Sequence, residues 1–100
     1  MGVYGALLEL PSTFSKTWSQ ELTIPEASTD LSGDVRVRRG RCVITIYEAT
    51  FKGTNMLAVQ YKTIWSSSRD ENERLLKDVV ERLITLGARK LDLTGDSSDR

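Results

Sequence analysis

The sequence predicts an α+β fold, a two-layer sandwich in which a long amphipathic helix covers one face of an antiparallel sheet of four to five strands. Two patterns lead to this prediction. Apolar residues recur at helical spacing over residues 68–86, and they alternate with polar residues over residues 34–65, where glycine-containing turns divide the chain into a three-strand meander. We expect one domain over residues 1–93 and a disordered polar tail over residues 94–100.

The C-terminal helix is the clearest element. Its charged side chains fall on one half of a helical wheel and its apolar side chains on the other, and Gly87 follows as a left-handed cap. Burial should hold this helix on the sheet, because each fully buried aliphatic side chain gains about 1.5–3 kcal/mol. The apolar half consists of Leu75, Leu76, Val79, Val80, Leu83, Ile84 and Leu86.

The meander is predicted from alternation on both sides of an Arg39-Gly40 turn. This register places Arg38 opposite Arg41. A second turn near Gly53 leads into a strand over residues 55–65, whose parity puts its apolar side chains on the same face as those of the first two strands. The shared inner face consists of Val35, Val37, Cys42, Ile44, Ile46, Leu57, Val59, Tyr61, Thr63 and Trp65.

The remaining segments carry weaker patterns. Residues 3–10 form a short apolar run that predicts a strand, and residues 12–20 favour a short helix. A short strand is expected at residues 21–24, a loop at residues 26–33, and a short edge strand at residues 90–93.

Composition excludes several kinds of chemistry. The chain has no histidine, so it cannot build Ser-His-Asp or Cys-His nucleophile pairs. A single cysteine, Cys42, cannot form a structural zinc site or an intramolecular disulfide. No glycine-rich nucleotide motif occurs. We therefore expect no catalytic residues, no metal and no cofactor.

The compartment is inferred from the same features. The first ten residues carry no basic leader, and no apolar stretch approaches the length of a membrane span. Together with the absence of disulfides, this indicates a cytoplasmic or nuclear protein.

The outer face of the meander is the candidate binding surface. Five basic and two acidic residues lie between Asp34 and Lys52, although the whole chain has fourteen of each sign. An ordinary solvated sheet face mixes the signs more evenly. The candidate binding residues on this face are Arg36, Arg38, Arg41, Tyr47, Lys62 and Ile64.

Three interpretations of this face remain open. It is a solvated surface, a protein-binding or self-association surface, or a nucleic-acid platform on which arginines contact phosphates and Tyr47 stacks on a base. We favour a non-enzymatic interaction or assembly module that forms a homodimer or heterodimer through this face or through an edge strand, with no membrane partner. RNA or DNA binding by the same residues is the alternative, and a net charge of zero counts against it.

Overall fold

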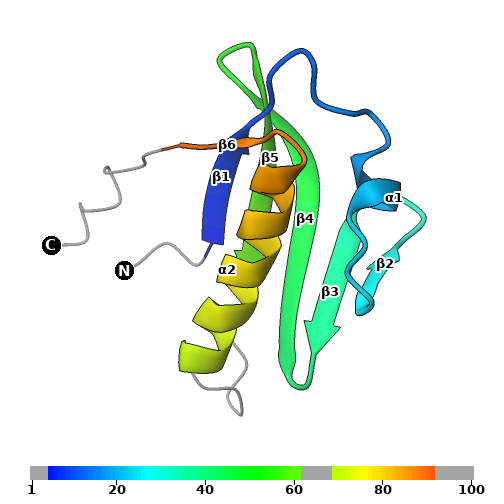
Figure 1. Ribbon diagram of the computed structural model, residues 1–100, viewed down its shortest axis with the longest axis vertical. Coiled ribbons are helices and arrows are strands. Elements are labelled where there is room, and N and C mark those ends of the chain that lie inside the picture. The colour runs from blue at the N-terminus through cyan, green and yellow to red at the C-terminus, as the bar shows by residue number, and fades with distance from the viewer. Residues whose placement is uncertain (1–4, 62–68, 92–100) are drawn as a thin grey trace, which may run out of the picture.

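The computed structural model describes residues 5–61 and 69–91, which form an antiparallel sheet with one long helix packed across one face (Figure 1). The sheet has six strands in the order β2-β3-β4-β5-β1-β6. The strands are β1 (Gly5–Glu9), β2 (Ala27–Thr29), β3 (Val35–Arg39), β4 (Cys42–Phe51), β5 (Thr54–Tyr61) and β6 (Arg89–Lys90), and the helices are α1 (Trp18–Glu21) and α2 (Arg69–Thr85).

The β3–β4 hairpin turns at Gly40-Arg41, one residue later than the sequence predicts. Arg39 pairs with Cys42, and Arg38 pairs with Val43. The predicted pairing of Arg38 with Arg41 is therefore wrong. Gly40 occupies the first central position of the turn with φ +63, the place where type II′ turns require glycine. Because the register moves by two residues, the strand side chains from Val35 to Arg38 and from Cys42 to Ile46 keep their predicted faces, whereas Arg41 lies in the turn and not on the outer face of a strand.

The β4–β5 hairpin turns at Lys52-Gly53, where both residues have positive φ, as in a type I′ turn. This turn pairs Ile46 with Val59 and Ile44 with Tyr61. The predicted inner face of β5 is thus confirmed as far as Tyr61. Thr63 and Trp65, expected further along the same face, lie outside the described residues.

The core forms where the inner face of the sheet meets α2. Val37, Ile44 and Ile46 are fully buried on the sheet side, and Leu75, Val79 and Leu83 fill the facing stripe of the helix. The helix ends as predicted at Gly87, which has φ +114. The Gly87 amide donates to the Ile84 carbonyl, and the Ala88 amide donates to the Leu83 carbonyl, which is the Schellman pattern.

One residue of the predicted apolar half of the helical wheel is exposed in the structure. Ile84 is 41% exposed, whereas the neighbouring Leu83 is fully buried. The helix stripe that contacts a flat sheet is narrower than half of the wheel, so residues at its margin remain in contact with water.

The segment between β1 and β3 departs most from prediction. The helix expected over residues 12–20 is reduced to α1, and the strand expected at residues 21–24 does not form. Residues 15–19 are rich in serine and threonine, which favour turns over helix interiors. Trp18 is nevertheless buried, and its indole N–H donates to Glu48 Oε2 at 2.9 Å, which fixes α1 against β4.

Residues 26–33, predicted as a loop, contain β2 and the turn into β3. The Asp30 carboxylate accepts hydrogen bonds from the Ser32 amide, the Ser32 hydroxyl and the Asp34 amide. This local side-chain cap closes the turn and allows β2 to pair with β3. Because β2 adds a strand, the sheet has six strands instead of the four to five expected.

The two edges of the sheet are short strands. β2 has three residues, and β6, the expected C-terminal edge strand, has two and pairs with Leu8 and Glu9 of β1. The tail predicted at residues 94–100 lies outside the described residues. Within the described part of the chain, no helix has the length and apolar character needed to cross a membrane.

One polar side chain lies in the buried stripe of α2. Asn72 is 3% exposed, and its Oδ1 accepts no hydrogen bond from the described residues. A buried acceptor without a donor costs about 1–3 kcal/mol. Asn72 therefore subtracts from the stability of an otherwise apolar contact.

Replacing Leu83 with alanine should lower the free energy of unfolding by about 2–5 kcal/mol, because the truncation leaves a cavity between helix and sheet. Ile84→Ala, one residue along the same helix, is the matched control and should cost about 1 kcal/mol or less. Urea denaturation of both variants checks the orientation of α2. Equal losses would contradict it.

Asn72→Leu should raise the free energy of unfolding by about 1 kcal/mol, since it removes a partnerless acceptor and adds apolar contact at similar volume. Thermal unfolding measures the effect. A lower melting temperature for this variant would show that Asn72 has a stabilising partner, contrary to the geometry described.

Candidate functional site

The outer face of the sheet carries two of the predicted basic residues, and a third lies in the hairpin turn beside it. Arg36 and Arg38 are exposed on β3, and the intervening Val35 and Val37 are at most 1% exposed on the other face. Arg41 occupies the second position of the hairpin turn. We call Arg36, Arg38 and Arg41 the basic row.

The basic row has few acidic neighbours. Its three arginines form no ion pair within residues 5–61 and 69–91. The pKa of Asp30 is lowered mainly by the Ser32 hydroxyl that donates to it, and Arg36 adds a smaller electrostatic contribution. Because Arg38 faces Val43, the like-charge repulsion expected between Arg38 and Arg41 does not arise from direct strand pairing.

Of the other three predicted binding residues, the structure describes Tyr47 alone. Tyr47 lies on the outer side of β4 and is half-buried, beyond Val43 and Thr45 on the same side of that strand. Lys62 and Ile64 lie outside the described residues. The structure therefore places four of the six predicted residues, and all four belong to the β3–β4 hairpin.

An apolar groove that the sequence analysis missed continues this face across β4, β5 and β1. It has a volume of about 580 Å³. Ala58 and Met56 form its floor and are 3% and 6% exposed, although α2 packs on the opposite side of the sheet. Its other outward-facing side chains are those of Leu7, Tyr47, Ala49, Phe51 and Gln60.

The groove could have been recognised from the residues at the outward positions of the strands that form it. Most outward positions of β1, β4 and β5 hold small or apolar residues, namely Gly5, Leu7, Ala49, Met56 and Ala58, where a solvated strand would carry charged side chains; Glu9, paired with Met56, is the charged exception on β1. Gly5 is needed at its position because a Cβ there would collide with the Val59 carbonyl oxygen. This close approach of β1 to β5 forms one end of the groove.

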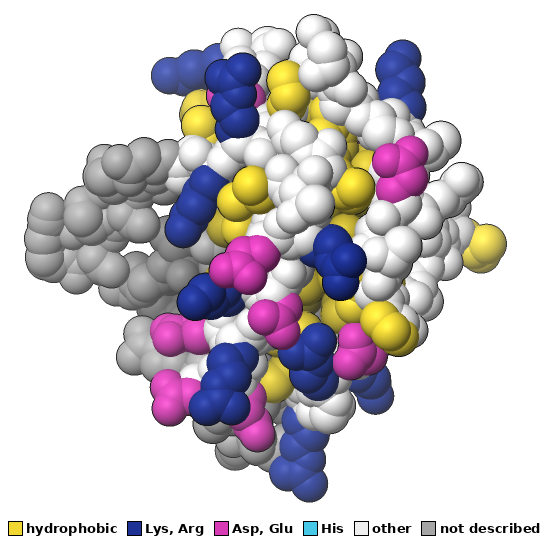
Figure 2. Space-filling model, viewed as in Figure 1, with side chains coloured by type: hydrophobic (Ala, Val, Ile, Leu, Met, Phe, Trp, Pro, Cys, Tyr) yellow, Lys and Arg dark blue, Asp and Glu magenta, His cyan; other side chains and the backbone are white. Residues whose placement is uncertain are grey.

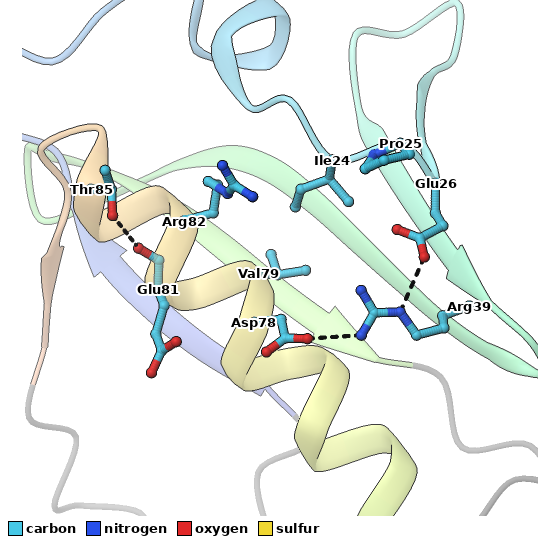
Figure 3. A pocket seen from close by; sticks show the side chains of 9 residues that line it. All are labelled: Ile24, Pro25, Glu26, Arg39, Asp78, Val79, Glu81, Arg82 and Thr85. Carbon is cyan, nitrogen blue, oxygen red and sulfur yellow. Dashed lines mark hydrogen bonds and ion pairs between the residues drawn. The ribbon is translucent and has the colours of Figure 1, made fainter.

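Arg39, which the sequence analysis assigned to the turn, lies on the helix side and links three segments (Figure 3). Its Nε donates to Glu26 Oε2 at 3.2 Å, and its Nη1 donates to Asp78 Oδ2 at 2.8 Å. We call this arrangement the Arg39 clamp. It spans a cavity of about 370 Å³ between α2 and the chain that leads into β2. The sequence analysis did not predict these contacts because it placed the turn one residue too early, with Arg39 inside it.

A second contact beside the clamp joins the same segments. Arg82 Nη1 donates to Thr23 Oγ1 at 3.1 Å, and Thr23 adopts a left-handed backbone with φ +51. The hydrogen bond from Arg39 lowers the pKa of Glu26, and the hydrogen bond to Asp78 is the largest cause of the raised pKa of Arg39. These contacts tie the chain before β2 to the helix.

The helix side of the molecule does not resemble the outer face. Figure 2 shows positive and negative side chains intermixed over α2, with apolar atoms visible between them. Such a surface is typical of a solvated amphipathic helix. The outer face differs in that Arg36 and Arg38 lie on the same surface as an apolar groove.

Chemical reactivity is limited in the described part of the chain. No three histidine, cysteine or acidic side chains within it are grouped to hold a metal ion. Cys42 is 3% exposed, and burial is the main cause of its raised pKa, so its thiol is protonated at neutral pH. A protonated, buried thiol is a core residue and a poor nucleophile.

No protein-family model matches the sequence, and no curated protein and no solved structure matches it significantly.

Replacing Arg39 with glutamine should reduce stability at neutral pH, because Glu26 and Asp78 lose their shared cation. The folded-state pKa of Glu26 is lowered from its usual 4.5, so its contribution is present at neutral pH and is lost as the pH falls through that lowered value. The difference between wild type and Arg39→Gln in the urea midpoint should therefore shrink as the solution is acidified through the lowered pKa of Glu26.

Arg38→Gln is the control for this measurement, since Arg38 has no carboxylate partner among the described residues. It should leave the midpoint unchanged at both pH values. A midpoint difference for Arg39→Gln that stays constant between pH 7 and pH 3 would rule out the Arg39 clamp as its source.

Proposed function

We propose that the chain is a non-enzymatic protein-interaction or assembly module that binds a partner protein through the outer face of its sheet. The apolar groove would form the centre of the interface, and the basic row would form part of its rim. The partner is a second copy of this chain or a different protein, which corresponds to a homodimer or a heterodimer.

The apolar groove is the observation that carries this proposal. Protein interfaces place apolar side chains at their centre and polar side chains around them, and they are enriched in tyrosine, methionine and arginine. Tyr47 lines the groove, and the next two outward positions on β4, Thr45 and Val43, lead to the basic row. The two features therefore lie on one continuous surface.

The sheet edges offer less to a partner than the face does. β2 pairs over three residues and β6 over two. Strand addition depends on a row of unpaired backbone groups, and short edge strands present few of them. Binding through the face is the form of the proposal that the described residues favour.

Nucleic-acid binding by the same face is the alternative. Single-stranded nucleic acid needs aromatic side chains near the cations, so that bases stack while phosphates are neutralised. Phe51, the other aromatic side chain on the outer side of β4, lies at the far end of that strand from the basic row. The outward positions of β4 between them are Ala49, Tyr47, Thr45 and Val43, so Tyr47 is the one aromatic side chain on β4 near the basic row, and the mixed apolar surface suits a protein partner better.

The experiment has two stages. The native mass of the purified chain, measured by light scattering, first establishes whether it self-associates, and affinity capture with nuclease treatment then identifies a partner if it does not. Phe51→Asp and Arg38→Glu should each weaken the measured interaction about tenfold or more, because one places a charge in the groove and the other reverses a rim charge.

Lys77→Glu is the matched control, since it reverses a charge on the exposed side of α2. It should leave binding unchanged. An interaction that nuclease abolishes, or one that Lys77→Glu weakens as much as Phe51→Asp does, would count against the proposal.

A further inference from the structure

A second basic cluster lies at the tip of the β3–β4 hairpin, on the side facing α2. There the turn and the first turns of the helix enclose a cavity of about 310 Å³. Volumes of this order are at the lower end for small-ligand sites. Its lining residues are Arg39, Gly40, Arg41, Cys42, Glu71 and Arg74.

The side chains of this cavity carry unequal charge. Arg39, Arg41 and Arg74 contribute three guanidinium groups, and Glu71 contributes one carboxylate. Arg41 and Arg74 are exposed and form no ion pair with any described residue. Arg39 is already paired with Glu26 and Asp78, so Arg41 and Arg74 are the cations of the cavity without a carboxylate partner among the described residues. An anion between them relieves their mutual repulsion.

One of the three guanidinium groups is held in place before any ligand arrives. The Nε and Nη1 atoms of Arg39 are hydrogen-bonded to Glu26 and Asp78. Arg41 and Arg74 approach from different elements, the hairpin turn and the helix. A fixed cation and two adjustable ones from opposite walls form a site that is partly ordered in advance, which lowers the entropy cost of binding.

We propose that this hairpin-tip cavity binds a phosphate group carried by a small molecule. A phosphate dianion matches the two guanidinium groups of Arg41 and Arg74 that have no ion pair among the described residues, and the planar fork of arginine donates paired hydrogen bonds to its oxygens. A monocarboxylate would match only one of the two. The small volume favours inorganic phosphate or a compact phosphomonoester.

This site is separate from the proposed protein-binding face. The cavity faces α2, whereas the apolar groove lies on the opposite side of the sheet. Arg41 is shared between the cavity and the basic row, but Arg74 belongs to the cavity alone and Arg36 to the row alone. These two arginines distinguish the two proposals.

The test is a calorimetric titration of the full chain at constant ionic strength with inorganic phosphate, O-phosphoserine and serine. Saturable binding of either phosphate compound, without binding of serine, is expected. Arg74→Gln and Arg41→Gln should each weaken it about tenfold, because each removes a hydrogen-bonded cation. Binding of inorganic phosphate would identify the free ion as sufficient, and binding of O-phosphoserine alone would identify the monoester.

Two further variants sharpen the result. Glu71→Gln should tighten phosphate binding several-fold, since it removes the carboxylate from the cavity, and Arg36→Gln should leave it unchanged. Circular dichroism confirms that each variant is folded.

The proposal is overturned if neither phosphate compound binds, or if Arg36→Gln weakens binding as much as Arg74→Gln does. It is also overturned if single-stranded RNA binds far more tightly through Arg36 and Arg74 together, which would indicate a nucleic-acid surface. None of these results depends on whether the outer face binds a protein.

Discussion

The structure depends on one contact, the packing of the apolar stripe of α2 against the inward side chains of β4 and β5, in a core cluster that also includes Val35 and Val37 of β3. Val37, Ile44 and Ile46 have no exposed surface, and the facing Leu75, Val79 and Leu83 have 1% or less. Burying each of these side chains contributes about 1.5–3 kcal/mol, far more than an exposed ion pair. The Arg39 clamp and the Trp18–Glu48 hydrogen bond arrange the periphery of a fold that this contact creates.

This contact also determines which side chains remain available for function. A strand has two sides, and once α2 covers one of them the alternate residues face the other. Arg36, Arg38 and Tyr47 are therefore on the outer face because Val35, Val37 and Ile46 are in the core. The apolar groove follows from the same rule, since Ala58 and Met56 alternate with the buried Leu57 and Val59.

The sequence predicted the parts of the fold that periodicity controls. The helix was placed within a residue or two, and the inner face of the meander was correct as far as Tyr61 because a register shift of two residues preserves parity. The turn position could not be read in the same way. Arg39-Gly40 and Gly40-Arg41 both place a glycine in a two-residue loop, and the choice between them depends on the sign of φ at each position.

The features that prediction missed depend on contacts between distant segments. β2 forms because Asp30 caps a turn and β3 offers an open edge, and neither is visible in the periodicity of residues 26–33. Arg39 meets Glu26 and Asp78 across 13 and 39 residues of sequence. The groove could be predicted only by knowing that β1 lies beside β5, and no local sequence pattern specifies that pairing.

The most direct test of this account is a methyl NOE experiment on the isotopically labelled chain. The account predicts NOEs between the methyl groups of α2, such as those of Val79 and Leu83, and the inward residues Ile44 and Ile46 of β4 and Val59 of β5. It predicts none from α2 to Val43, which lies on the outer side of β4. Cross-peaks between Val43 and the helix, with none from Ile44, would contradict the division of the sheet into a face covered by α2 and an opposite, outer face.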